Sequence, residues 1–212
     1  MSARLDPIAG VILAGGLGRR FGGADKALID FHGRPLLAHV VDRLAPQVDS
    51  LLLSANGDPT RFAAFALPVL PDPVADAPGP LAGLAAAALH LGRRRPDVAR
   101  LLTVAVDLPL LPPTLVADLA AALDAAPRAR VAVARSGGRV HPVVALHRLD
   151  GLDDLVAGLA SGAVRRVMTW VEARGMVEVD FSTADGDPFA NLNSPDDLAA
   201  LAAATLPRGT PP

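Results

Sequence analysis

The stretch Ile12-Leu-Ala-Gly-Gly-Leu-Gly-Arg-Arg-Phe-Gly-Gly-Ala-Asp-Lys26 concentrates five glycines, two arginines and a lysine directly after a short apolar run. The run, residues 8–13, has the composition of a buried strand, so the glycines are expected in the loop that follows it. Glycine allows positive φ and close approach, so successive backbone N–H groups can turn towards an anion. Arg19, Arg20 and Lys26 add positive charge beside this cradle, which suits a polyphosphate. The loop therefore predicts a nucleotide-binding site.

Two better-known glycine loops do not fit this stretch. A P-loop has Lys and then Ser or Thr after its second glycine, whereas Ala24 and Asp25 follow Gly23. The dinucleotide fingerprint needs a third glycine where Phe21 stands. The loop therefore indicates a different class of nucleotide-binding protein.

The rest of the chain alternates between apolar strands and amphipathic helices. Helices are expected from Pro35 to Leu44, at 59–65, from Pro80 to the arginines 93–95, from Pro112 or Pro113 to Leu123, and at 149–159, 164–173 and 195–204. Strands are expected at 27–31, 51–53, 69–70, 101–106, 131–134, 143–146 and 177–181. Such alternation predicts a three-layer α/β/α fold with a mainly parallel sheet. The hairpin of 131–134 and 143–146 would extend that sheet antiparallel.

Composition narrows the class of protein further. The 212 residues suffice for one domain with a substantial core, so a single domain is expected over 1–205, with a disordered tail at 206–212. A net charge of −2 and 3% aromatic residues argue against a nucleic-acid or anionic-membrane surface. The absence of cysteine excludes disulfides and thiolate metal sites. Because we find neither a signal-peptide pattern nor a membrane-length apolar run, we expect a cytoplasmic protein.

Several polar or glycine-rich segments follow directly after predicted strands. In an open parallel sheet, ligands bind beyond the carboxyl ends of the strands. We therefore expect four groups of residues along one edge of the sheet: Ala14 to Gly16, Ser54 to Asn56, Asp72 and Asp107.

Asp107 is the strongest candidate for a metal ligand. A carboxylate on a rigid strand end suits Mg²⁺, which takes one or two carboxylates together with phosphate oxygens. The ion would stabilise charge on an α-phosphate as pyrophosphate leaves. The alternative is a turn aspartate before Leu108-Pro109. Arg19 and Lys26 would hold the triphosphate, unless they are ordinary exposed charges, and Asp25 is expected to orient Lys26 through an ion pair.

The loop pattern Leu-Ala-Gly-Gly-x3-Arg-x-Gly-Gly-x-Asp-Lys is followed by further motifs that span nearly the whole chain. They are Gly33-Arg34-Pro35-Leu36-Leu37, Asp72, Gly79-Pro80-Leu81-Ala82-Gly83, Asp107-Leu108-Pro109, His141-Pro142 and Asn191-Leu192-Asn193-Ser194-Pro195. This ordered set resembles the molybdenum cofactor guanylyltransferases, or MobA family, of the nucleotide-diphospho-sugar transferase superfamily. The chain departs from the family pattern at Ser54, where asparagine is common, and at Phe21, where methionine is usual.

The resemblance implies transfer of GMP from Mg-GTP to the terminal phosphate of molybdenum-molybdopterin, with release of pyrophosphate. It implies catalytic roles for Arg19, Lys26 and Asp107, with Mg²⁺ held by Asp107. The implied GTP contacts are Leu13, Ala14, Gly15, Gly16, Lys26, Ser54, Asp72 and Asp107. Asn191 and Asn193 would lie at the pterin end, although they could instead arrange the turn before the Ser194 helix cap. His141 matches a family position near the acceptor and is not assigned as a base.

A molybdopterin-delivery protein and molybdoenzyme targets are the partners that the resemblance implies. Three alternatives stay open. The first is a cytidylyltransferase that uses CTP on the same acceptor. The second is a sugar-1-phosphate nucleotidyltransferase, against which the Asn-Leu-Asn-Ser-Pro segment counts. The third is a non-catalytic carrier of nucleotide or pterin, against which Asp107 and Lys26 count.

Overall fold

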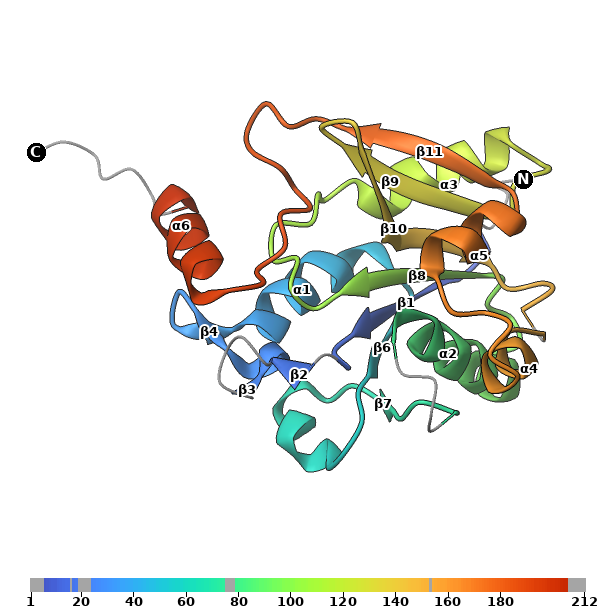
Figure 1. The fold of residues 1–212 in the computed structure, drawn as a ribbon, viewed down its shortest axis with the longest axis horizontal. Helices are drawn as coiled ribbons and strands as arrows, with labels where there is room; N and C mark the ends of the chain where they lie inside the picture. Colours follow the sequence, from blue (N-terminus) through green and yellow to red (C-terminus); the bar gives the residue numbers. More distant parts are fainter. Residues whose placement is uncertain (1–5, 16, 19–23, 75–78, 153, 206–212) are drawn as a thin grey trace, which may run out of the picture.

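The computed structural model describes residues 6–15, 17–18, 24–74, 79–152 and 154–205. Its centre is a seven-stranded sheet in the order β11-β9-β10-β8-β1-β6-β7 (Figure 1). These strands are β1 (Ile8–Leu13), β6 (Ser50–Ser54), β7 (Val69–Leu70), β8 (Arg100–Ala105), β9 (Val131–Ser136), β10 (Arg139–Arg148) and β11 (Met176–Phe181). All neighbouring pairs are parallel except those of β10, which runs antiparallel to both β8 and β9. The mainly parallel, mixed sheet expected from the sequence is thus confirmed.

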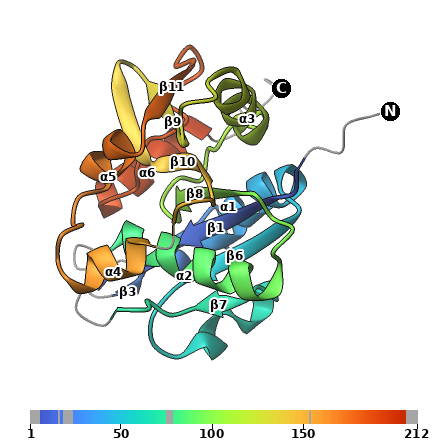
Figure 2. The ribbon, with the colours of Figure 1, turned by 90° about the vertical axis from the view of Figure 1, so that its right-hand side faces the viewer.

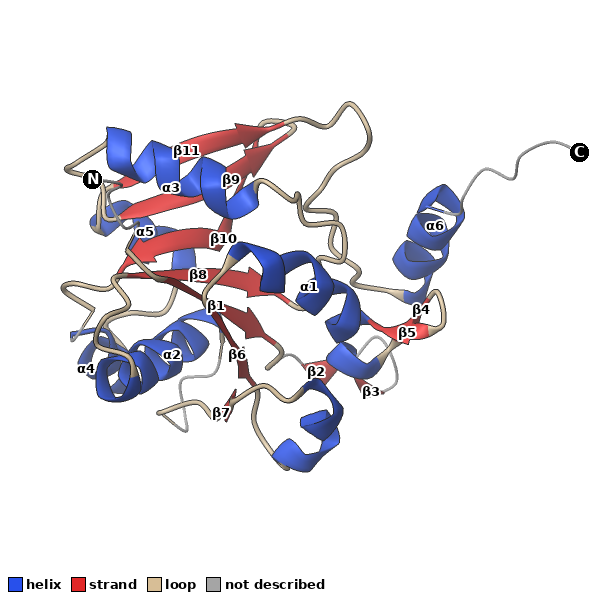
Figure 3. Cartoon of the chain, turned by 180° about the vertical axis from the view of Figure 1, so that it is seen from behind, coloured by secondary structure: helices blue, strands red, loops and turns tan. Residues whose placement is uncertain are grey.

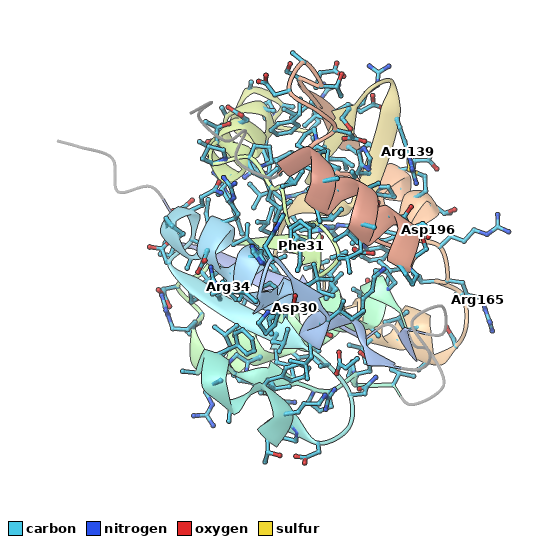
Figure 4. The ribbon with its side chains drawn as sticks, turned by 90° about the vertical axis from the view of Figure 1, so that its left-hand side faces the viewer. Asp30, Phe31, Arg34, Arg139, Arg165 and Asp196 are labelled. Carbon is cyan, nitrogen blue, oxygen red and sulfur yellow. The ribbon has the colours of Figure 1, made fainter. Side chains whose placement is uncertain are left out.

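Two short hairpins lie beside the sheet. One pairs β2 (Leu17–Gly18) with β3 (Ala24–Asp25), and the other pairs β4 (Asp30–Phe31) with β5 (Arg34–Pro35). Helix α6 (Pro195–Thr205) packs its Leu198 and Leu201 against a small cluster that includes Phe31. Figure 4 shows α6, with Asp196 labelled, above the second hairpin, which carries Asp30, Phe31 and Arg34.

Helices cover both faces of the sheet, because the side chains of each strand alternate between two apolar cores. One core packs α1 (Leu36–Leu44) and α3 (Leu115–Ala125) against residues such as Ile12 (Figure 3). The other packs α2 (Pro80–Arg94) and α4 (Asp154–Ala160) against residues such as Ala9 and Val11. Helix α5 (Val167–Ala173) lies on this second face, over β9 and β10. Figure 2 shows the resulting three layers, with the sheet between the two groups of helices.

Helix α2 approaches the sheet unusually closely at its first turn. A Cβ added to Gly83 would lie 2.4 Å from Leu13 Cδ2 and 2.7 Å from Ser54 Oγ. A larger residue at this position would require the side chains of Leu13 and Ser54 to move. The preceding Gly79 has a φ of 131°, a conformation that L side chains rarely adopt, and Pro80 then begins the helix.

Three local expectations differ from the structure. Residues 27–31 do not form one strand: a short 3-10 helix, η2 (Lys26–Leu28), comes first, because Asp25 caps it through the Ala27 N–H. The helix expected at 59–65 is also 3-10, η4 (Pro59–Phe65). Residues 149–152 form a turn after β10, in which Gly151 has a φ of 71°, and the helix begins only at Asp154. The tail, 206–212, lies outside the described residues.

No helix within the described part of the chain has both the length and the apolarity that a membrane span requires.

The sheet buries a histidine, His147, that does not line the cavity described below. His147, on β10, is 1% exposed, its Nε2 lies 3.4 Å from Thr103 Oγ1, and its Nδ1 has no partner among the described residues. Burial, assisted by the nearby charge of Arg174, lowers the pKa of His147 from 6.5 to about 3. The folded protein therefore keeps this imidazole neutral at any ordinary pH.

This burial predicts a pH-dependent stability. Between pH 6.5 and about 3, the unfolded chain binds a proton at His147 and the folded chain does not. The contribution of His147 to the free energy of unfolding is thus fully present above pH 6.5. Below that pH it is lost by about 1.4 kcal/mol for each pH unit. Urea unfolding between pH 7 and pH 5 should show a weaker loss of stability in His147→Gln than in the natural protein. The same dependence of unfolding free energy on pH in both proteins would contradict the prediction.

Candidate active site

A cavity of about 330 Å³ opens at the carboxyl ends of β1, β6, β7 and β8. It is lined by many of the residues that the sequence singled out: Leu13, Gly15, Lys26, Ser54, Asp72, Asp107 and Asn191. Ala14 is buried beneath it and donates its backbone N–H to Ser54 O at 2.9 Å. Gly16, Arg19 and Arg20 lie outside the described residues. The edge expected from the strand order is therefore the edge at which the cavity opens.

A short ion pair lies in this cavity. Lys26 Nζ is 2.6 Å from Asp107 Oδ2, and the two side chains are 14% and 11% exposed. Asn191 donates to the same carboxylate oxygen at 3.3 Å, and Lys26 donates to Asn193 Oδ1 at 3.1 Å. Four residues far apart in the sequence thus form one connected cluster.

The two asparagines do not arrange the turn before α6 with their side chains. That role belongs to Ser194 Oγ, which accepts from the Asp197 N–H at 3.2 Å, and to Asp197, which accepts from the Asn193 N–H at 2.9 Å. The side chains of Asn191 and Asn193 instead reach Asp107 and Lys26.

Asp25 does not form the expected ion pair with Lys26. Its Oδ1 accepts from the Ala27 N–H at 3.1 Å, and its Oδ2 pairs with Arg61 Nε at 2.7 Å. Because the cap turns the carboxylate back along its own backbone, Lys26 is left to pair with Asp107. Asp25 therefore holds the 3-10 helix η2 that presents Lys26.

Arg61 is a residue that the sequence did not reveal, because nothing in its position in η4 indicates such a role. Besides Asp25, its guanidinium donates to the Asn56 carbonyl at 2.6 Å and to the Asp58 carbonyl. Asn56 in turn holds Asp72: the Asn56 amide donates to Asp72 Oδ2 at 2.7 Å and accepts from the Asp72 N–H at 2.9 Å. One guanidinium thus joins the end of the glycine loop to the Asn56–Asp72 pair.

Strand β10 supplies the opposite wall of the cavity. The wall includes Arg139, His141, Pro142 and Val143, of which the sequence singled out only the His-Pro pair. The pairing register of β10 shifts between His141 and Ala145, so the strand bulges here. Arg139, labelled in Figure 4, is the first residue of β10 and follows the turn that joins β9 to β10. The antiparallel pairing of β9 and β10 was expected from the sequence, but the bulge is a tertiary feature, so the sequence pattern did not reveal the rest of this wall.

The described residues contain no group of three or more His, Cys, Asp or Glu side chains that could hold a metal ion. Asp107 fits the role of one metal ligand, because its Oδ1 is buried and has no hydrogen-bond partner among the described residues. One carboxylate oxygen together with phosphate oxygens is the ligand set that Mg²⁺ prefers.

A cation and a carboxylate in a cavity at the carboxyl ends of parallel strands suit the phosphates of a nucleotide and their metal. Residues 10–175 match the sequence family described as the MobA-like NTP transferase domain. The chain is 47% identical over 190 residues to a molybdenum cofactor guanylyltransferase from Rhodopseudomonas palustris, and the match covers 89% of this chain and 90% of the relative. The chain belongs to the molybdenum cofactor guanylyltransferase family.

Solved structures share the fold at low sequence identity. The molybdopterin-guanine dinucleotide biosynthesis protein A from Archaeoglobus fulgidus superposes with a TM-score of 0.71 at 20% identity, covering 92% of this chain and 97% of that one. Rv0371c from Mycobacterium tuberculosis, in complex with manganese, superposes with a TM-score of 0.63 at 18% identity, covering 93% and 98%.

The contacts of Arg61 predict that it positions both ends of the nucleotide site. Arg61→Met removes charge-assisted hydrogen bonds to Asp25 and Asn56, so we expect the affinity for the nucleoside triphosphate to fall roughly ten-fold. Calorimetric titration measures this change, with Arg43→Met on the exposed side of α1 as the matched control. An unchanged dissociation constant in Arg61→Met would show that the two ends are positioned independently of it.

Proposed function

We propose that the protein transfers GMP from Mg-GTP to the terminal phosphate of molybdenum-molybdopterin, in this cavity, and releases pyrophosphate. The observation that carries the proposal is the Lys26–Asp107 pair, in which a cation and a carboxylate with one unpartnered oxygen lie together in the cavity. A polyphosphate with its metal needs both a cation and a hard oxygen ligand. The guanylyltransferase name of relatives at high coverage supports this choice of substrates.

In the proposed reaction, an oxygen of the acceptor phosphate attacks the α-phosphorus of GTP in line, and the bond to the β-phosphate oxygen breaks. Lys26 would hold the phosphates and neutralise charge on the departing pyrophosphate. Mg²⁺ bound through Asp107 would supply electrostatic stabilisation of the α-phosphate. We assign a further phosphate contact to Arg19, together with the backbone of Gly15 and Gly16. No general base is required, because the acceptor phosphate is already anionic.

We assign the guanosine part of GTP to the other end of the cavity, beside Leu13, Ala14, Ser54 and Asp72. The Asn56 side chain fixes Asp72, because it donates to Asp72 Oδ2 and accepts from the Asp72 backbone N–H. Guanine offers two adjacent N–H donors, on N1 and N2, to a fixed carboxylate, whereas cytosine offers one amino group. This difference supports GTP over CTP as the substrate.

Asn191 and Asn193 would serve the pterin end of the cavity and keep Asp107 and Lys26 in place. Delivery of molybdopterin by a partner protein and transfer of the product to molybdoenzymes are part of the same proposal. We place the reaction in the cytoplasm, where GTP is made.

Titration of the protein with GTP, CTP, ATP and UTP, each with and without Mg²⁺, tests the nucleotide choice. We expect selective binding of GTP that Mg²⁺ strengthens and Lys26→Ala weakens, because Lys26 is the described cation nearest the metal carboxylate. A preference for CTP would reassign the product, and no binding would favour a carrier.

Asp107→Asn tests the metal site separately. The amide keeps the size of the side chain but is a poor Mg²⁺ ligand, so we expect a roughly 100-fold or greater loss of transfer and the loss of the Mg²⁺ effect on GTP binding. Asp118→Asn, on the exposed surface of α3, is the matched control. Full activity in Asp107→Asn would contradict the mechanism.

A further inference from the structure

Three side chains on separate segments form a hydrogen-bonded chain behind the β10 wall of the cavity. Ser136 ends β9, His141 lies in β10, and Asp187 lies in the loop after β11. Ser136 Oγ is 2.7 Å from Asp187 Oδ1 and 2.8 Å from His141 Nε2. Ser136 is 2% exposed and His141 is 7% exposed, so both are fixed by their surroundings.

The number of protons available decides the direction of each hydrogen bond. An ionised carboxylate can only accept, so the single Ser136 hydroxyl proton goes to Asp187. Ser136 Oγ must then accept from His141, whose Nε2 carries the proton. The order Asp–Ser–His differs from the Asp–His–Ser order that activates a serine nucleophile, because here the serine proton faces the acid and not the base. This arrangement positions the histidine rather than the serine.

The direction of these bonds fixes the tautomer of His141. With a proton on Nε2, a neutral ring has a lone pair on Nδ1. Nδ1 has no hydrogen-bond partner among the described residues, is not among the buried unpartnered atoms, and belongs to a ring that lines the cavity. The ring of Phe189 packs against the imidazole, with centroids 4.9 Å apart, and limits its rotation. The cavity therefore contains a fixed hydrogen-bond acceptor.

The surroundings favour the neutral form of this ring. Burial lowers the pKa of His141, the charge of Asp187 opposes this effect, and the charge of Arg139 adds to it. The segment that carries Asp187 and Phe189 continues to Asn191 and Asn193, which contact Asp107 and Lys26. The histidine is therefore joined through one short segment to the ion pair.

We propose that the Asp187–Ser136–His141 chain presents His141 Nδ1 as an acceptor for a hydrogen-bond donor on the acceptor substrate. The inference rests on the proposed function, because it assumes that the β10 wall faces the acceptor. The nucleotide contacts lie on β1, β6 and the loop that begins with Asp72, so they leave this wall to the second substrate. His141 selects and orients a substrate that has a donor at this point, and it takes up no proton.

The donor can come from two parts of such a substrate. One is a ring N–H or amino group of a heterocycle, which keeps its proton at every pH near neutrality. The other is the P–OH group of a phosphate monoanion, which is present mainly below a pH of about 6. The pH range in which loss of the His141 acceptor weakens binding of the acceptor substrate therefore distinguishes the two sources of the donor.

His141→Phe tests the inference, because phenylalanine keeps a ring against Phe189 and removes the acceptor atom. In the transfer assay, we expect KM for the acceptor to rise roughly 3- to 10-fold, with little change in kcat and with unchanged GTP affinity by calorimetry. A higher acceptor KM at both pH 6 and pH 8.5 identifies an N–H donor. A higher acceptor KM at pH 6 alone identifies a P–OH donor. His90→Phe, on α2 away from the cavity, is the matched control.

Ser136→Ala tests the chain itself and leaves His141 in place. Two-dimensional ¹⁵N NMR of the histidine rings should show His141 protonated on Nε2 in the natural protein and a mixture of tautomers in Ser136→Ala. Acceptor KM should rise in that variant too. The His141 signal is assigned by its absence from the spectrum of His141→Phe.

The inference is overturned if His141 is protonated on Nδ1, or if His141→Phe has the acceptor KM of the natural protein. A loss of GTP affinity in His141→Phe would also overturn it, because the wall would then face the nucleotide. Failure of the proposed function is distinct from these results, because the natural protein itself would then bind no GTP or transfer no GMP.

Discussion

The contact between Lys26 and Asp107 is the interaction on which the site depends. Two opposite charges that are largely withdrawn from water stabilise each other only if the surrounding polar atoms complete their hydrogen bonding. Asn191 and Asn193 each supply one such bond, to Asp107 Oδ2 and from Lys26 Nζ, and leave Asp107 Oδ1 without a partner among the described residues. The glycine loop, the end of β8 and the segment before α6 are thereby held together at one point. A nucleotide with its metal would meet a site whose charges are already positioned.

Much of this arrangement follows from local sequence. Strands β1, β6 and β8 could be predicted because each is largely an apolar run. The edge at which a ligand binds could be predicted because parallel strands have their carboxyl ends at the same edge of the sheet. Asp107 and Lys26 could be singled out because unusual chemistry surrounds them. The resemblance to a family then brought Asn191 and Asn193 into the prediction, although not their contacts.

The rest depends on tertiary contacts that leave no local pattern. Arg61 lies in a short 3-10 helix, and its role comes entirely from the distant Asp25 and Asn56. The partner of Asp25 was predicted wrongly, because a helix cap redirects its carboxylate. His141 could be noticed only as part of a His-Pro pair, since Ser136 and Asp187 reach it through strand pairing and a loop. The spacing of Ser136, His141 and Asp187 in the sequence does not indicate that their side chains form one hydrogen-bonded chain.

The ion-pair cluster also affects the order in which the site can form during synthesis. Lys26 and Asn193 are separated by 167 positions, so the cluster closes only after the segment that follows β11 has left the ribosome. A nascent chain that ends before Asp187 would contain the glycine loop and the β8 carboxylate without either asparagine. In such a chain, Lys26 and Asp107 could pair with each other but would lack the hydrogen bonds to Asn191 and Asn193. The segment after β11 thus completes a site that begins with Lys26, on the loop after β1.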